Sequence, residues 1–181
     1  MALKRDLRWQ PAEGIGLEHC HVSETADGIA VRSSLVGEAD GFPFGVFYEV
    51  TLDPDWTFRS LVLRRHDGRV LRLTSNGQGD WKCDGRRAPE FEGCADIDIS
   101  GTPLTNTLLI RRVRFEIGVP RHFDMIYVPL DTLEPFRDEQ IYTKLDDSHF
   151  RYETADGTFT QELTIDTDGF VLDYPTLFRR V

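Results

Sequence analysis

The sequence has no apolar run approaching the roughly 18 residues that a membrane-spanning helix needs. It has only three cysteines, Cys20, Cys83 and Cys94, and this odd number includes no closely spaced pair. An odd count without an export signal is typical of a reducing compartment. Residues 1–9 carry charge, but no apolar stretch follows them. We therefore expect a cytoplasmic protein with no transmembrane segment.

The sequence has fewer basic than acidic residues. The 21 Lys and Arg residues face 31 Asp and Glu residues, which gives a formal net charge of −10. A surface this acidic repels phosphate backbones at long range, so we expect no nucleic-acid partner. Arginines do occur as adjacent pairs, but neighbours on a strand point to opposite faces and do not form a patch by themselves.

Linear catalytic motifs are also missing. The sequence contains no Gly-x-Ser-x-Gly elbow, no His-Glu-x-x-His helix, and no glycine-rich loop that leads from a strand into a helix. His19 and His21 would share one face of a strand, yet no second ligand pair accompanies them. We predict two surface histidines beside a buried Cys20, and we assign no metal, no cofactor and no catalytic residue.

Turn signals and alternating strands are abundant in these 181 residues. Such turn dipeptides supply the positive φ angles of tight hairpins. They are Asp27-Gly28, Asp40-Gly41, Asp67-Gly68, Asn76-Gly77, Asp84-Gly85, Asp156-Gly157 and Asp168-Gly169. The runs between them have strand length, and several alternate between apolar and polar residues. This pattern predicts one domain over residues 1–181, of the all-β class, built as a barrel-like antiparallel meander of about 12–15 strands without parallel crossovers.

The expected strands can be placed by residue number. They are Gly16–Val22, Ile29–Val36, Val46–Leu52, Trp56–Arg65, Val70–Leu73, Asp80–Cys83, Ala95–Ile99, Arg112–Ile117, Phe123–Val128, Gln140–Leu145, His149–Glu153, Phe159–Asp166 and Phe170–Tyr174.

One helix start interrupts this pattern. Thr102 is suited to cap a helix and Pro103 to occupy its first position. Leucines follow at helical spacing, and Arg111 and Arg112 would lie near the negative end of the helix dipole. Thr105 to Thr107 are mediocre helix formers, so the alternative of no helix stays open. If the helix forms, its apolar character predicts burial against the sheet.

Two groups of residues could make a functional site. Asp96 and Asp98 share one face of their predicted strand, where they could bind a hard cation, act in acid–base chemistry, or remain solvated or pair with arginines. Aromatic residues gather in residues 42–48 and again in residues 170–178. They could line a cavity for an acyl chain or a sugar face, although an ordinary core would use them equally well.

Three segments of the sequence resemble a bacterial family labelled "putative glycolipid-binding". The first runs from Gly93–Asp98 through Thr102–Leu108 to Ile110–Arg112; the second is Gly79-Asp80-Trp81 with Asp84-Gly85; the third is Asp173-Tyr174-Pro175 with Leu177–Arg180. The resemblance implies a spiral β-roll, in which a many-stranded sheet wraps around a single α-helix, and a homodimer. The sequence departs from the family pattern where Leu109 replaces a common Pro and Thr176 replaces a common Gly.

Two hypotheses follow. In the first, an apolar cavity beside the helix holds a lipid or glycolipid as partner, with polar contacts from the candidate ligand-binding residues. These candidates are Asn106, Arg111, Arg112, Asp96, Asp98 and Trp81. In the second, the protein is an enzyme for a small polar metabolite, in which Asp96, Asp98 and Arg111 converge in one pocket. A structural role for the arginines, as partners of the two aspartates, is the alternative to both.

Overall fold

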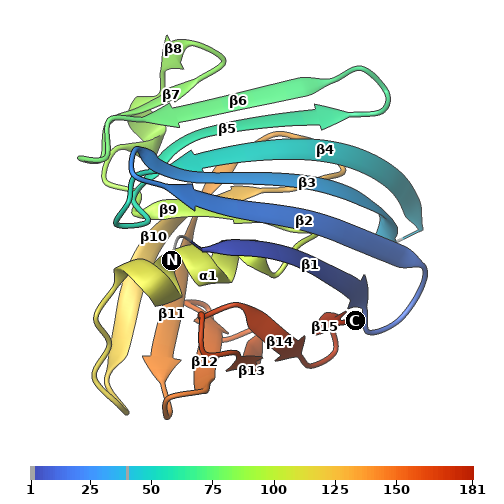
Figure 1. Ribbon diagram of the computed structural model, residues 1–181. Coiled ribbons are helices and arrows are strands. Elements are labelled where there is room, and N and C mark those ends of the chain that lie inside the picture. The colour runs from blue at the N-terminus through green and yellow to red at the C-terminus, as the bar shows by residue number, and fades with distance from the viewer. Residues whose placement is uncertain (1–2, 40) are drawn as a thin grey trace.

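The computed structural model describes residues 3–39 and 41–181, and within them fifteen strands form a single sheet that curls around one α-helix (Figure 1). The strand order in the sheet is β8-β7-β6-β5-β4-β3-β2-β1-β15-β14-β13-β12-β11-β10-β9. The strands are β1 (Lys4–Pro11), β2 (Gly16–Thr25), β3 (Gly28–Ala39), β4 (Phe42–Leu52), β5 (Phe58–Arg65), β6 (Val70–Ser75), β7 (Trp81–Cys83), β8 (Arg86–Arg87), β9 (Asp96–Ile99), β10 (Pro120–Val128), β11 (Phe136–Lys144), β12 (His149–Thr154), β13 (Thr160–Ile165), β14 (Val171–Tyr174) and β15 (Phe178–Arg180). This architecture confirms the all-β roll around a single helix.

Tight turns join most neighbouring strands, as the sequence predicts. All seven glycines of the expected turn dipeptides have positive φ angles, between 71° at Gly157 and 144° at Gly28. At Gly28 an added Cβ would lie 2.5 Å from the carbonyl oxygen of Leu52, so both conformation and space require glycine there. Asp40, the first residue of the second dipeptide, lies outside the described residues. The turns produce two antiparallel meanders, β1–β8 and β10–β15.

One strand pair, β1–β15, joins these meanders, and a second pair adds β9 to the free edge of β10. Strands β1 and β15 pair in antiparallel fashion, with Trp9 opposite Arg180, which places the first and last strands of the described chain side by side in the middle of the sheet. Strand β9 pairs with β10 in parallel, with Ile97 opposite Ile126. The expectation of a purely antiparallel meander is wrong at this pair. A parallel connection needs a crossover, and the helix α1 (Leu104–Arg112) provides it.

Helix α1 forms where the sequence allows it, with one difference at its start. The helix begins at Leu104, one residue later than expected, and Pro103 precedes it with φ −80° and ψ −3°. The Thr102 hydroxyl accepts a hydrogen bond from the Leu104 amide at 3.1 Å, so it satisfies a free helix donor as a cap would. Residues 104–109 are all buried, and Arg111 and Arg112 lie in the last turn as predicted.

The alternating segment after the helix is not a strand. Residues 113–116 have no regular structure, and Ile117 makes one isolated bridge to Lys144. Val113 and Phe115 instead pack against the core, where the Phe115 ring lies edge-on to Phe123 at 6.1 Å and to Phe150 at 5.1 Å, whereas Ile117 is exposed. The alternation of apolar and polar residues in this segment therefore arises because the segment packs against the sheet without pairing as a strand.

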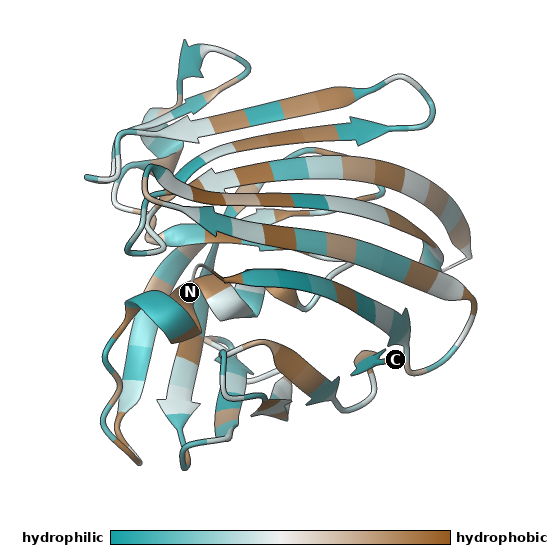
Figure 2. Cartoon of the chain, in the orientation of Figure 1, coloured by the Kyte–Doolittle hydropathy of each residue, from teal (hydrophilic) through white to brown (hydrophobic). Residues whose placement is uncertain are grey.

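Two apolar clusters fill the roll, one on either side of the β9–β10 pair. The first lies mainly between β1–β7 and the inner strands, and includes Ile97 and Ile126. The second lies between α1 and β10–β14, and includes Leu109 and Met125. Figure 2 shows the matching alternation of apolar and polar residues along the long strands. Because both faces of β9 are covered, its polar residues are not exposed to solvent as those of an outer strand would be.

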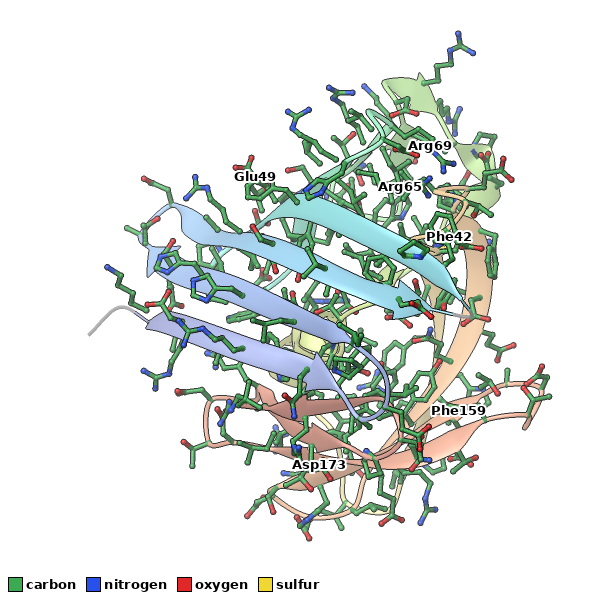
Figure 3. All side chains as sticks on the ribbon, turned by 90° about the vertical axis from the view of Figure 1, so that its right-hand side faces the viewer. Phe42, Glu49, Arg65, Arg69, Phe159 and Asp173 are labelled. Carbon is green, nitrogen blue, oxygen red and sulfur yellow. The ribbon has the colours of Figure 1, made fainter. Side chains whose placement is uncertain are left out.

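The loop between β10 and β11 is fastened to the opposite meander by two arginines, both labelled in Figure 3. Arg65 is 8% exposed, and its Nη1 donates a hydrogen bond to the Leu130 carbonyl oxygen at 3.0 Å. Arg69 donates to the Thr132 carbonyl oxygen at 2.9 Å. The Arg65 guanidinium also lies 5.0 Å from the centre of the Phe42 ring. These contacts hold the β10–β11 loop against the ends of β4 and β5.

The two remaining sequence expectations concern membrane segments and histidines. In the described part of the chain, no helix has the length and apolar character to cross a membrane. Cys20 is fully buried between His19, which is exposed, and His21, whose Nδ1 lies 2.7 Å from an Asp6 oxygen. Two outward histidines around a buried cysteine are what the sequence predicts.

Candidate functional site

A cavity of about 320 Å³ opens beside the first turn of α1. Seven strands or their ends contribute to its walls, together with one residue of the helix itself. The lining residues are Asp98, Ile99, Ser100, Thr102, Asn106, Tyr127, Phe136, Asp138, Tyr152, Thr154, Phe159, Tyr174, Leu177 and Phe178. We call this the aromatic pocket, because six of these residues carry an aromatic ring. Figure 3 labels one of these lining residues, Phe159.

Asp98 on β9 forms part of the pocket wall next to the helix. Its Oδ1 accepts a hydrogen bond from the Thr105 hydroxyl at 2.9 Å, and its Oδ2 accepts one from Gln140 Nε2 at 2.8 Å. Burial raises the pKa of Asp98, while these two hydrogen bonds oppose the rise. The carboxylate is therefore held in a fixed orientation by donors on both α1 and β11, with part of its surface toward the pocket.

A second carboxylate shares the same donor. Gln140 Nε2 also donates to Asp138 Oδ2 at 3.0 Å, so one amide nitrogen bridges Asp138 and Asp98. Gln140 is fully buried, and its Oε1 has no hydrogen-bond partner among the described residues. The strand alternation explains this arrangement, because residues 136, 138, 140 and 142 of β11 all point to the same face.

Asn106 joins the helix to the same strand. Its Oδ1 accepts a hydrogen bond from the Tyr142 hydroxyl at 2.8 Å, and its Nδ2 donates to the Pro103 carbonyl oxygen at 3.2 Å. Both ends of the amide are thus engaged. A residue with low helix propensity is retained here because its side chain fastens α1 to β11.

The rings make a nearly continuous wall. Tyr152 lies 6.2 Å from Tyr174 and 6.0 Å from Phe159, and Tyr174 lies 6.4 Å from Phe178. On the opposite side, Tyr127 lies 5.2 Å from Phe136, which is 49% exposed at the rim. Ring centroids at these separations are in favourable mutual contact.

The tyrosine hydroxyls of this wall stay protonated at neutral pH. Burial, followed by the nearby Asp98 carboxylate, raises the pKa of Tyr127 to about 12. The same two causes raise the pKa of Tyr152 and of Tyr174 further. The pocket therefore offers flat ring faces, neutral hydroxyls and two carboxylates to a ligand.

A more apolar hollow of about 210 Å³ adjoins the aromatic pocket. The two share Ser100, Leu177 and Phe178 in their walls. Beyond these, Ile15 and Val36 extend the hollow to the surface, where Ile15 is 82% exposed and Val36 is 50% exposed. Exposed aliphatic side chains beside a ring-lined pocket create an amphipathic surface.

Four of the six residues predicted as ligand contacts lie outside the aromatic pocket. Asp96 is fully buried, and its Oδ2 lies 3.1 Å from Nη2 of Arg112. Arg111 lines a different cavity, where its guanidinium lies 4.4 Å from the centre of the Trp56 ring and donates a hydrogen bond to the Asp168 carbonyl oxygen. The expected pairing of an arginine with an aspartate is confirmed for Arg112. The structure does not bring Asp96, Asp98 and Arg111 together in one pocket.

Trp81, another predicted ligand contact, lies in the hydrophobic core. It is 3% exposed, its ring stacks on Phe58 at 4.9 Å, and its Nε1 donates to the Cys94 carbonyl oxygen at 3.2 Å. The Cys94 carbonyl precedes strand β9, so Trp81 ties the short β7 to the inner edge of the roll.

Sequence reasoning located part of the aromatic pocket. It singled out Asp98 and Asn106, and it noted the aromatic cluster that contains Tyr174 and Phe178. It missed Asp138 and the bridging amide of Gln140, because the expected strand begins at residue 140 whereas β11 begins at Phe136. The alternation through residues 136–142 was the signal that could have placed Asp138 on the inner face.

Together, the fold and the pocket define a class: a spiral β-roll that encloses a helix and carries a ring-lined amphipathic cavity. Comparison with known families matches residues 6–180 to the family described as "Putative glycolipid-binding". The chain belongs to this family. It is also similar to a crystal structure of a DUF1089 family protein from Pseudomonas aeruginosa, with 36% sequence identity, a TM-score of 0.78, and coverage of 91% of this chain and 92% of that one. No match was found among curated proteins.

Proposed function

We propose that this protein binds an amphiphile, with the headgroup in the aromatic pocket and the start of the apolar chain in the adjoining hollow. The observation that carries the proposal is that the two cavities adjoin: a ring-lined pocket with two carboxylates shares Ser100, Leu177 and Phe178 with a hollow that has exposed aliphatic residues. Aromatic faces pack well against the C–H faces of sugar rings, and carboxylates accept hydrogen bonds from hydroxyls. A glycolipid, the ligand named in the family description, has both parts.

The energetics of the hollow support an apolar occupant. Ile15 and Val36 present aliphatic surface to water, and covering such surface contributes about 25 cal/mol for each Å² removed from water. The helix side of the aromatic pocket is rigid, because Asp98 and Asn106 are each held by two hydrogen bonds. A rigid polar site limits the entropy lost when a headgroup becomes ordered.

The first test uses octyl glucoside, a neutral sugar with a short alkyl chain, below its micelle concentration. Isothermal titration calorimetry should detect saturable binding to the wild-type protein. Ile15→Asp should weaken that binding at least about tenfold, because a charge in the hollow opposes the alkyl chain. Ile117→Asp is the matched control, since Ile117 is 62% exposed and lines neither cavity. Equal affinity of the Ile15 variant and the wild type, or no binding at all, would overturn the proposal.

The natural ligand can be sought in parallel. Native mass spectrometry of protein purified from its own host, followed by lipid extraction, should show a co-purifying amphiphile. Repeated absence of any such mass, together with no thermal shift across a panel of lipids, counts against the proposal.

Assembly and location are two further proposals. The family resemblance favours a homodimer, which light scattering at several protein concentrations would measure. The sequence favours the cytoplasm, which fractionation of the host would measure. A monomer, or recovery outside the cytoplasm, would overturn the respective proposal.

A further inference from the structure

The lining of the aromatic pocket carries negative charge without a matching positive charge. Asp98 and Asp138 both contribute to its wall, and its fourteen lining residues include no Lys, Arg or His. Cationic side chains on the neighbouring strands are engaged elsewhere: Arg112 with Asp96, Arg137 with Asp124 at 2.7 Å, and Lys144 with Asp147 at 2.9 Å. The two carboxylates thus face the cavity with neutral partners only.

The bridging amide does not neutralise this charge. Gln140 Nε2 is within hydrogen-bond distance of an oxygen on both Asp98 and Asp138, so the two like charges are held close together. The same buried amide leaves its Oε1 without a partner in the described structure. A buried acceptor without a donor is costly, and adjacent carboxylates repel one another. The site therefore offers neutral hydroxyl donors and two carboxyl groups, but no cationic donor.

The walls indicate what kind of cation would fit. Aromatic faces attract organic cations through the ring quadrupole, and the rings here include Tyr152, Tyr174 and Phe178. A hard metal ion takes about six or more oxygen ligands, and no group of three or more His, Cys, Asp or Glu side chains in the described structure is placed to hold one. A protonated amine supplies N–H donors for the carboxylates and a cationic surface for the rings.

We propose that the aromatic pocket selects a headgroup that bears a protonated amine, such as an amino sugar, which Asp98 and Asp138 bind beside the ring wall. This inference rests on the proposed amphiphile binding and narrows its ligand class. It also excludes anionic headgroups, because a phosphate or sulfate would meet two carboxylates and no basic side chain.

Three probes with the same alkyl chain test the charge preference: octylammonium, octyl glucoside and octyl sulfate, each titrated calorimetrically below its micelle concentration. Octylammonium should bind at least about tenfold more tightly than octyl glucoside, and octyl sulfate should bind least. If octyl glucoside binds and octylammonium binds no more tightly, the amine preference is wrong while the amphiphile function stands. If none of the three binds, both proposals fail.

Variants distinguish binding by the pocket carboxylates from general attraction to the acidic surface of the protein. Asp98→Asn and Asp138→Asn should each reduce octylammonium affinity about fivefold or more, and should reduce octyl glucoside affinity by a smaller factor, because an asparagine side chain still accepts a hydrogen bond from a sugar hydroxyl. In Asp98→Asn the amide oxygen can still accept the hydrogen bond from Thr105, and a turned Gln140 amide can then offer its free Oε1 to the new amide nitrogen. Asp27→Asn, on an exposed turn, removes one charge at a distance and should have no effect beyond about twofold. An equal loss in the Asp27 variant would show general charge attraction and overturn the inference.

One further arm addresses metal ions. Calcium chloride in the same calorimeter should give no saturable heat and should not compete with octylammonium beyond its effect on ionic strength, for which sodium chloride is the control. Competition that disappears in Asp98→Asn would identify a divalent cation site instead and would overturn the inference.

Discussion

Arg112 at the end of helix α1 forms an ion pair with Asp96 on β9, at 3.1 Å between Nη2 and Oδ2. The arginine is 23% exposed at its side chain, whereas the aspartate is fully buried. The same guanidinium donates a hydrogen bond to the Ala95 carbonyl oxygen at 3.0 Å. The last turn of the only α-helix in the described residues is thereby locked to the inner edge of the sheet.

Removal of Arg112 should strongly destabilise the fold. At pH 8, above the pKa of about 7 that Asp96 has in the folded protein, Arg112→Ala leaves this buried carboxylate without its charged partner, which costs about 3 kcal/mol or more. Urea unfolding should show a decrease in the free energy of unfolding of that order. Arg114→Ala, at an exposed position two residues along the chain, is the control and should change stability by no more than about 0.5 kcal/mol. Similar stabilities for the two variants would contradict a structural role for the ion pair.

The stability contributed by Asp96 should depend on pH. Burial raises its pKa from 3.8 to about 7, although Arg112 acts in the opposite direction. The unfolded chain releases this proton near pH 4, while the folded chain retains it until near pH 7, so the contribution is fully present below about pH 4 and is lost as the pH rises to about 7. Asp96→Asn should remove this loss.

The measurement is a difference between variant and wild type. Relative to wild type, Asp96→Asn should gain more than about 1 kcal/mol in unfolding free energy between about pH 4.5 and about pH 8. Asp27→Asn controls for the loss of one surface charge. A difference that does not change with pH would show that Asp96 titrates normally in the folded protein.

Thr176 should be a site where glycine stabilises the protein. Its φ angle is 67°, a left-handed conformation that is costly for a β-branched residue, and its hydroxyl accepts one hydrogen bond of 3.3 Å from Gln161. Thr176→Gly should raise the free energy of unfolding by about 0.5–1 kcal/mol, after the flexibility of glycine in the unfolded chain is subtracted. Thr160→Gly, at an exposed strand position without a positive φ, should lower it. A loss of stability in both variants would sink this prediction.

Arg111 should prove to be architectural. Its guanidinium covers the Trp56 ring and binds the Asp168 carbonyl oxygen, so it connects α1 to the turn between β13 and β14. Arg111→Ala should lower stability by about 1–2 kcal/mol and leave binding in the aromatic pocket unchanged. Thermal unfolding and octyl glucoside titration, with Arg64→Ala as the exposed control, distinguish the outcomes. Normal melting combined with lost binding would assign Arg111 to the ligand site.

The sequence predicts the hairpins of the two meanders well, because turn residues and the alternation within each strand determine them locally. Each turn dipeptide places a glycine where φ is positive, and the strands between them alternate with one face toward the core. The turn pattern does not indicate β1, β8 or β15; the last two have two and three residues. The sequence misplaces residues 113–117 and the direction of β9 relative to β10, because both depend on how α1 folds back.

The candidate site is harder to predict from sequence than the outer strands, because it also depends on how α1 folds back against the sheet. On β9, Asp96 and Asp98 share one face and resemble the wet side of an outer strand, yet the helix covers that face. Their different roles come from position: Asp96 meets Arg112, while Asp98 meets Thr105 and Gln140. Periodicity places a residue on a face, but it does not say what covers the face or which distant strand supplies the donor.

The pairing of β1 with β15 has a consequence for how the protein acquires its structure. The two meanders are made of local hairpins and can form early, but they remain unjoined until β15 is available to pair with β1. Closure over nearly the whole sequence length is slow, since the loop entropy is lost before the contact forms. The edge of β1 therefore stays unpaired, and open to pairing with another chain, until β15 has been made.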